Sequence, residues 1–208
     1  ALCPVPEPFL PVMLGAHVPA DLLAQQLGQS ERAADARLAA AAVVAQQGGV
    51  QLTTVRETDT VDRLGALLAR HARRADLCIV GQPDPDHGEL DMSLLAEAAF
   101  MDSGRPALVV PKDGTLAVLP QRIVVAWDGS REAARAVNDA LPFCARADEV
   151  VVLVVDAAAH ASGLGREPGA GIAAHLARHG VAVSVVQASS GAAGIGGTIL
   201  AQVGEQRA

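Results

Sequence analysis

The sequence predicts an α/β fold built on parallel sheets. Apolar runs rich in β-branched residues recur along the 208 residues, and they lack the strict apolar–polar alternation of strands with one solvated face. These predicted strands lie at 50–55, 76–81, 106–111, 122–127, 149–156 and 181–186. Helical patterns separate them, at 20–47, 60–74, 90–101, 130–145, 169–179 and 196–207. Strands and helices in alternation imply right-handed crossovers, and therefore parallel sheets flanked by helices.

The helix predicted at 130–145 has a clear start signal. Ser130 can accept a hydrogen bond from a backbone N–H group of the first turn, and Glu132 places a negative charge in that turn, where the helix dipole favours it. The change from strand to helix is therefore expected at Asp128–Ser130.

Composition excludes several functional classes. The 16 Lys and Arg residues against 23 Asp and Glu give a formal charge of −7, which argues against a nucleic-acid-binding protein. Three Phe, one Trp and no Tyr offer few platforms for stacking bases. The apolar runs are shorter than the roughly 20 residues that span a bilayer, so no membrane segment is predicted. The N-terminal ALCPVPEPFLPVML is a poor signal peptide, and three widely spaced cysteines fit reduced thiols in the cytoplasm.

An internal repeat predicts two domains. Residues 45–75 align with 177–208 in the order helix end, glycine, strand, loop and helix, so that Val50 falls on Val181 and Val55 on Val186. We therefore expect a first domain at 1–111, a linker at 112–121 and a second domain at 122–208. Each copy lacks a part of the other: the first has no counterpart of the strand and helix at 122–145, and the second stops before the strand that corresponds to 76–81.

The residues that carry these patterns resemble the universal stress protein family. The resemblance rests on RIVVAWDGS, the alanine-rich helix and EVVVLVVD of the second copy, and on ADLCIVG and RPALVVP of the first. It covers nearly the whole chain and implies a tandem member. It further implies two Rossmann-like domains, each an open parallel sheet flanked by helices. The first would lack its opening strand and helix, and the second its last strands and phosphate loop.

The resemblance also implies an adenine-nucleotide site in the second domain, formed by Ala126, Trp127, Asp128, Gly129 and Ser130. Ligands of such folds bind beyond the carboxyl ends of the strands. Asp128 can accept hydrogen bonds from a ribose or an adenine amino group, while Gly129 lets the backbone approach the ligand and Ser130 caps the helix. The alternative, that Asp128 only stabilises a turn, stays open.

The phosphate half of the family's site has the pattern G-x2-G-x9-G-[S/T]. In the first copy Gly81 fits, but Asp84 and Leu94 replace the other glycines, and the acidic segment GQPDPDHGELD carries further carboxylates that would repel phosphate. The first domain is therefore not expected to bind ATP. In the second copy the loop would lie beyond this sequence.

A second match to the glycine spacing is interpreted as coincidence. Gly191, Gly194 and Gly204 fit it, but Glu205 replaces the Ser or Thr, and the segment follows the third strand of its domain and not the fourth. Gly204 is expected inside or near the end of a helix. Thr198 and the N–H groups near Gly196 remain able to bind an adventitious anion at the helix start.

Neither a metal site nor a catalytic residue is predicted. His175 and His179 are spaced i, i+4 on a predicted helix, but without further ligands they are expected on its solvated face. His87 lies among carboxylates in a loop that is interpreted as solvated surface. Cys78 is interpreted as a small core residue.

The preferred hypothesis is a cytoplasmic universal stress protein, a regulatory or protective module that binds ATP or AMP in its second domain. Its two domains would form an intramolecular pseudo-dimer, and the whole would pair as a homodimer. The alternatives are a structural protein-interaction module that has lost its nucleotide site, and a weak ATP-hydrolysing enzyme.

Overall fold

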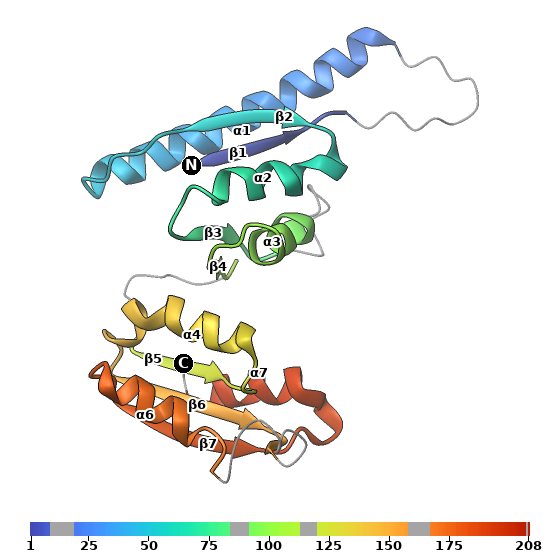
Figure 1. Ribbon diagram of the computed structural model, residues 1–208. Coiled ribbons are helices and arrows are strands. Elements are labelled where there is room, and N and C mark those ends of the chain that lie inside the picture. Colours follow the sequence, from blue (N-terminus) through green and yellow to red (C-terminus); the bar gives the residue numbers. More distant parts are fainter. Residues whose placement is uncertain (9–18, 84–91, 113–119, 158–166, 207) are drawn as a thin grey trace. The chain divides into compact units, whose positions relative to one another are not determined.

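The computed structural model describes residues 1–8, 19–83, 92–112, 120–157, 167–206 and 208. The chain divides into two compact units, residues 1–114 and 115–208. Both are α/β structures in which parallel strands are flanked by helices (Figure 1).

The first unit holds two separate pairs of parallel strands. Its strands are β1 (Leu2–Pro6), β2 (Val55–Asp59), β3 (Cys78–Gly81) and β4 (Ala107–Val110). β1 pairs with β2, and β3 pairs with β4. The helical elements are α1 (Ala20–Gln47), the 3-10 turn η1 (Val61–Arg63), α2 (Leu64–Ala72) and α3 (Met92–Met101).

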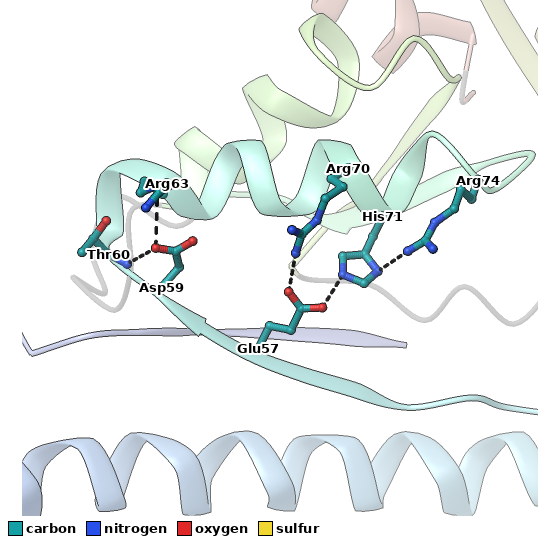
Figure 2. A network of polar contacts seen from close by, with 7 residues as sticks. All are labelled: Glu57, Asp59, Thr60, Arg63, Arg70, His71 and Arg74. Carbon is teal, nitrogen blue, oxygen red and sulfur yellow. Dashed lines mark hydrogen bonds and ion pairs between the residues drawn. The ribbon is translucent and has the colours of Figure 1, made fainter.

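Helices α1 and α2 cover opposite faces of the β1–β2 sheet. Arg56 of β2 donates a hydrogen bond to Asp35 of α1 at 2.5 Å, whereas the next residue, Glu57, accepts one from Arg70 of α2 at 2.5 Å. Because successive side chains of a strand point to opposite faces, the sheet lies between the two helices (Figure 2). Val5 of β1 is fully buried in this arrangement.

The strand predicted at 50–55 is wrong in position. The structure places β2 at Val55–Asp59, and Val50 is 63% exposed. The reason is that β2 contacts its helices through charged side chains: Arg56 bonds to α1 and Glu57 bonds to α2. Its sequence, VRETD, therefore lacks the apolar pattern of a buried strand.

Strand β1 has no counterpart among the predicted strands. Pro4 and Pro6 break up its sequence, LCPVP, and proline has no N–H group to contribute to a sheet. Both are accommodated because β1 is an edge strand with one partner, β2.

Small side chains form the core around β3. Cys78 and Val80 of β3 pack with Ala72 of α2 and with Ala96 and Ala99 of α3. Alanines allow close packing of helices on the short strand. The prediction that Cys78 is a core residue is confirmed.

The three thiols should differ sharply in reactivity. Burial raises the pKa of the Cys78 and Cys144 thiols, whereas Cys3 is only partly buried. Because the thiolate is the reactive form, we expect Ellman's reagent at pH 7.5 to modify one thiol within minutes and two far more slowly. In denaturant all three should react at once. Rapid reaction of two or three thiols in the native protein would show that a core around Cys78 or Cys144 opens readily.

The second unit is one three-stranded parallel sheet in the order β5-β6-β7. Its strands are β5 (Arg122–Ala126), β6 (Glu149–Val155) and β7 (Val183–Ala188). The helical elements are α4 (Arg131–Cys144), α6 (Ala170–Arg178), the 3-10 turn η3 (Gly191–Ala193) and α7 (Gly194–Gln206).

Strand β6 is the centre of this unit, and Val150 through Val155 are all buried. Val150, Val152 and Val154 pack with Val137 of α4 and Leu176 of α6. α4 and α6 therefore cover one face of the sheet. The other face receives α7, which contacts both β5 and β6.

The repeat seen in the sequence has a structural counterpart. In the first unit β2 leads through η1 into α2, and in the second β7 leads through η3 into α7. Both segments thus follow the order strand, 3-10 turn and helix. None of the helices among the described residues is long and apolar enough to cross a membrane.

Candidate functional site

A hollow of about 340 Å³ lies at the carboxyl ends of β5 and β6, on the face of the sheet that α7 covers. Three elements besides the strands contribute to it: the turn after β5, the first turn of α4, and α7. It is lined by Ala126, Trp127, Asp128, Ser130, Glu132, Ala133, Leu153, Val155, Ile195 and Ile199. In parallel α/β sheets this edge is where ligands bind.

The turn from β5 into α4 is held by its own side chains. Asp128 Oδ1 accepts a hydrogen bond from the Ser130 backbone N–H at 2.8 Å, and Ser130 Oγ accepts one from the Ala133 N–H at 3.0 Å. Gly129 has φ +80°, a conformation that a side chain would disfavour. Asp128 thus stabilises the turn while it also lines the hollow.

Four of the five residues predicted for the site line this hollow. They are Ala126, Trp127, Asp128 and Ser130. Gly129 shapes the turn between them and does not line the hollow. Trp127 extends the strand pairing by one residue, since its N–H donates to the Leu153 carbonyl at 2.8 Å.

The charged groups at the hollow are negative. Asp128 and Glu132 are both exposed, and the lining includes no Lys, Arg or His among the described residues. A hydrogen bond from Arg131 holds the pKa of the Glu132 carboxyl below its usual value, so Glu132 is ionised at neutral pH. The site is therefore better suited to an uncharged or weakly polar group than to a polyphosphate.

Sequence reasoning missed the opposite wall of the hollow, formed by Ile195 and Ile199. Their i, i+4 spacing is the available signal, because it places both side chains on one face of a helix. It predicts a buried stripe, however, and does not reveal which strands the stripe faces.

Asp156 links the ends of β6 and β7 by hydrogen bonds, and sequence reasoning did not single it out. Its Oδ1 accepts a hydrogen bond from the Ser190 N–H at 2.9 Å, and its own N–H donates to the Ala188 carbonyl at 2.9 Å. Asp156 has φ +52°, which aspartate tolerates better than most residues. This contact fixes the start of the connection into α7.

The glycine spacing at 191–204 serves helix geometry. Gly191 and Gly194 have positive φ values of +53° and +69° around η3, while Gly204 lies within α7, as expected. The Thr198 hydroxyl is placed to donate to the Ser190 carbonyl at 3.1 Å and the Gly194 carbonyl at 2.9 Å. The hydroxyl that had been considered for an anion is thus engaged by the backbone.

His175 of α6 and His179, the residue that follows this helix, lie together. Their rings meet edge to face with centroids 4.9 Å apart. The expectation that both are solvated is wrong for His175, whose Nε2 is buried and has no hydrogen-bond partner within the described part of the chain. No cluster of three or more His, Cys, Asp or Glu side chains is arranged for a metal among the described residues. His87 and the acidic residues at 84–91 lie outside the described residues.

The first unit has a separate hollow of about 390 Å³ at the carboxyl end of β1. It is lined by Pro6, Glu7, Pro8, Gln26, Gln29, Ser30 and Val61. The lining combines two prolines and Val61 with polar side chains, and it offers no aromatic or large aliphatic wall comparable to Trp127 with Ile195 and Ile199.

Comparison of the chain with models of known protein families gave no match, and a search of curated proteins also gave none.

Proposed function

We propose that the second unit binds the nucleoside part of an adenine nucleotide, and that the chain is a tandem universal stress protein with a regulatory or protective role. The observation that carries the proposal is the hollow itself. It brings the end of β5, with Trp127 and Asp128, opposite Ile195 and Ile199 of α7. Small-molecule sites are typically concave and apolar with a few placed polar groups, as this one is.

The chemistry of the lining is suited to a purine base. Leu153, Val155, Ile195 and Ile199 supply apolar surface for the flat faces of an adenine, together with Trp127. The exposed Asp128 carboxylate is an acceptor for the adenine amino group or a ribose hydroxyl. A hollow of about 340 Å³ is at the small end of the range for ligand sites, which suits a nucleoside.

The same lining sets the order of affinities. Because Asp128 and Glu132 are the charged lining residues, bound phosphates are expected to point away from the hollow. We therefore expect adenosine and AMP to bind at least as tightly as ATP.

The single tryptophan makes the proposal directly testable. Trp127 lines the hollow, so adenosine binding should change its fluorescence, and calorimetry should give the same dissociation constant. Asp128→Ala should weaken binding about tenfold, the value of a hydrogen bond to a charged group. Asp128→Asn keeps an acceptor for the Ser130 N–H, and its affinity for adenosine should lie between those of the parent protein and Asp128→Ala.

Asp148→Ala is the matched control, because Asp148 is an exposed aspartate at the amino end of β6, at the other edge of the same sheet. It should bind adenosine like the parent protein. Unchanged fluorescence and heat with millimolar adenosine, AMP and ATP would reject the proposal in favour of a structural interaction module. Steady release of ADP from ATP above a protein-free control would favour a hydrolysing enzyme instead.

A further inference from the structure

Four arginines gather where α2 and α3 end, at the amino ends of β3 and β4. They are Arg70, Arg73, Arg74 and Arg105, and all four are exposed. Cations near helix C-termini are favourable because the last carbonyls carry partial negative charge. This accounts for their presence, but of the four only Arg70 is paired with a carboxylate among the described residues, that of Glu57.

Two of these side chains are fixed by a reciprocal contact between the helix ends. Arg73 Nη2 donates to the Asp102 carbonyl just after α3 at 3.2 Å. Arg105 in turn donates from Nε and Nη2 to the Arg73 carbonyl just after α2, at 3.2 and 3.0 Å. Each contact uses one or two of the five N–H donors of a guanidinium.

The other two are linked through His71 and Glu57, as Figure 2 shows. Glu57 contacts Arg70 Nη2 at 2.5 Å and His71 Nε2 at 2.7 Å, while Arg74 Nη2 lies 3.3 Å from His71 Nδ1. Because arginine can only donate, Nδ1 is the acceptor in this contact. Arg74 is therefore held by an imidazole nitrogen and not by a carboxylate.

The cluster keeps most of its positive charge. Within the described part of the chain, Arg73, Arg74 and Arg105 have no carboxylate oxygen within 4.0 Å, whereas some arginines elsewhere do, for example Arg56 with Asp35 and Arg135 with Asp139. In a chain of formal charge −7, three neighbouring guanidinium groups held by backbone carbonyls and an imidazole are a local exception.

We propose that this arginine cluster is a docking surface for a short acidic segment of a partner protein. The planar guanidinium group is suited to bidentate hydrogen bonds with carboxylates. Since neutral contacts already hold the groups in place, less conformational entropy is lost when a carboxylate binds. A short acidic segment is favoured over a long polyanion such as nucleic acid, because a chain of formal charge −7 would repel the part of a long ligand that extends past the cluster.

The test uses the full chain and a fluorescein-labelled eight-residue peptide with four glutamates, with fluorescence anisotropy at low salt. Binding is expected, and it should weaken strongly at 0.3 M salt because exposed charges are screened. Arg74→Gln should weaken binding about fivefold, the upper end for one exposed ion pair. The Arg74 side chain makes one hydrogen bond within the described residues, to His71, so this substitution should be mild for the fold, which the melting temperature would check.

Two controls make each outcome decisive. Arg178→Gln removes an exposed arginine of α6 in the other unit and should leave the affinity unchanged. The same peptide with four glutamines should not bind. The proposal is overturned by absence of binding at low salt, by equal binding of the glutamine peptide, or by equal effects of the two substitutions. Tighter binding of a labelled five-nucleotide oligothymidine, which has four phosphates, would also overturn it in favour of a nucleic-acid surface.

Discussion

Gly169→Ala is expected to destabilise the second unit by about 3 kcal/mol. Gly169 precedes α6 with φ +87°, and a Cβ atom there would lie 2.8 Å from Val185 Cγ1 and 3.1 Å from Val154 Cγ2. The left-handed conformation alone costs an alanine roughly 1–2 kcal/mol, and overpacking of a well-filled core adds about 1–3 kcal/mol. Val154 is fully buried in β6, so it cannot move away without disturbing the core, whereas Val185 is 39% exposed and can relieve part of the clash by rotating its side chain.

Gly180→Ala is the matched control for this substitution. Gly180 follows α6 with φ +77°, but a Cβ atom there would meet nothing within 4 Å. It should therefore carry the conformational cost alone, about 1 kcal/mol. Urea unfolding should be monitored by Trp127 fluorescence. This signal reports on the second unit, since Trp127 is the single tryptophan of the chain and lies at the end of β5. Equal losses in the two variants would show that α6 does not pack this closely on the sheet.

Much of the second unit could be predicted from the sequence, because its central strand, β6, is buried on both faces. The run EVVVLVV of β6 is apolar at consecutive positions, and the structure buries Val150 through Val155. The start of α4 was also predicted correctly, since Ser130 forms the expected cap with the Ala133 N–H. Where burial and local hydrogen bonding decide the structure, the pattern was sufficient.

The first unit shows where such patterns fail. β2 places Arg56 and Glu57 against α1 and α2, so it is stabilised by ion pairs whose partners lie far away in the sequence. β1 contains prolines that a central strand would exclude but an edge strand accepts. In both strands tertiary contacts override local preference, and a single sequence does not reveal them.

The candidate site was predictable on one side only. Asp128, Gly129 and Ser130 form a local strand–turn–helix pattern that the sequence states directly. The opposite wall, Ile195 and Ile199, comes from α7 and reaches the hollow because α7 packs on β5 and β6. That choice of face depends on how α7 packs after β7, which periodicity within the helix does not specify.

Leu176→Ala should cost the second unit about 3 kcal/mol while leaving its ligand affinity intact. Leu176 of α6 is completely buried and packs in one cluster with Val150, Val152, Val154 and Val181. Truncation of a buried leucine costs roughly 2–5 kcal/mol, because the lost burial is compounded by the cavity that remains. The urea midpoint measured by Trp127 fluorescence should fall, with little change in the dependence of the unfolding free energy on urea.

Leu200→Ala is the matched control for Leu176→Ala. Leu200 of α7 is 74% exposed, so its truncation should change stability by no more than about 0.5 kcal/mol. Leu176 lies on the face of the sheet opposite Leu153 and Val155, and Trp127 is the one lining residue that also packs against its cluster. Adenosine affinity measured without denaturant should therefore survive Leu176→Ala even as stability falls. A Leu200→Ala variant as unstable as Leu176→Ala would mean that Leu200 is covered in solution. Loss of adenosine binding in Leu176→Ala, with the protein still folded, would mean that the hollow depends on the core behind β6 and not only on its own lining.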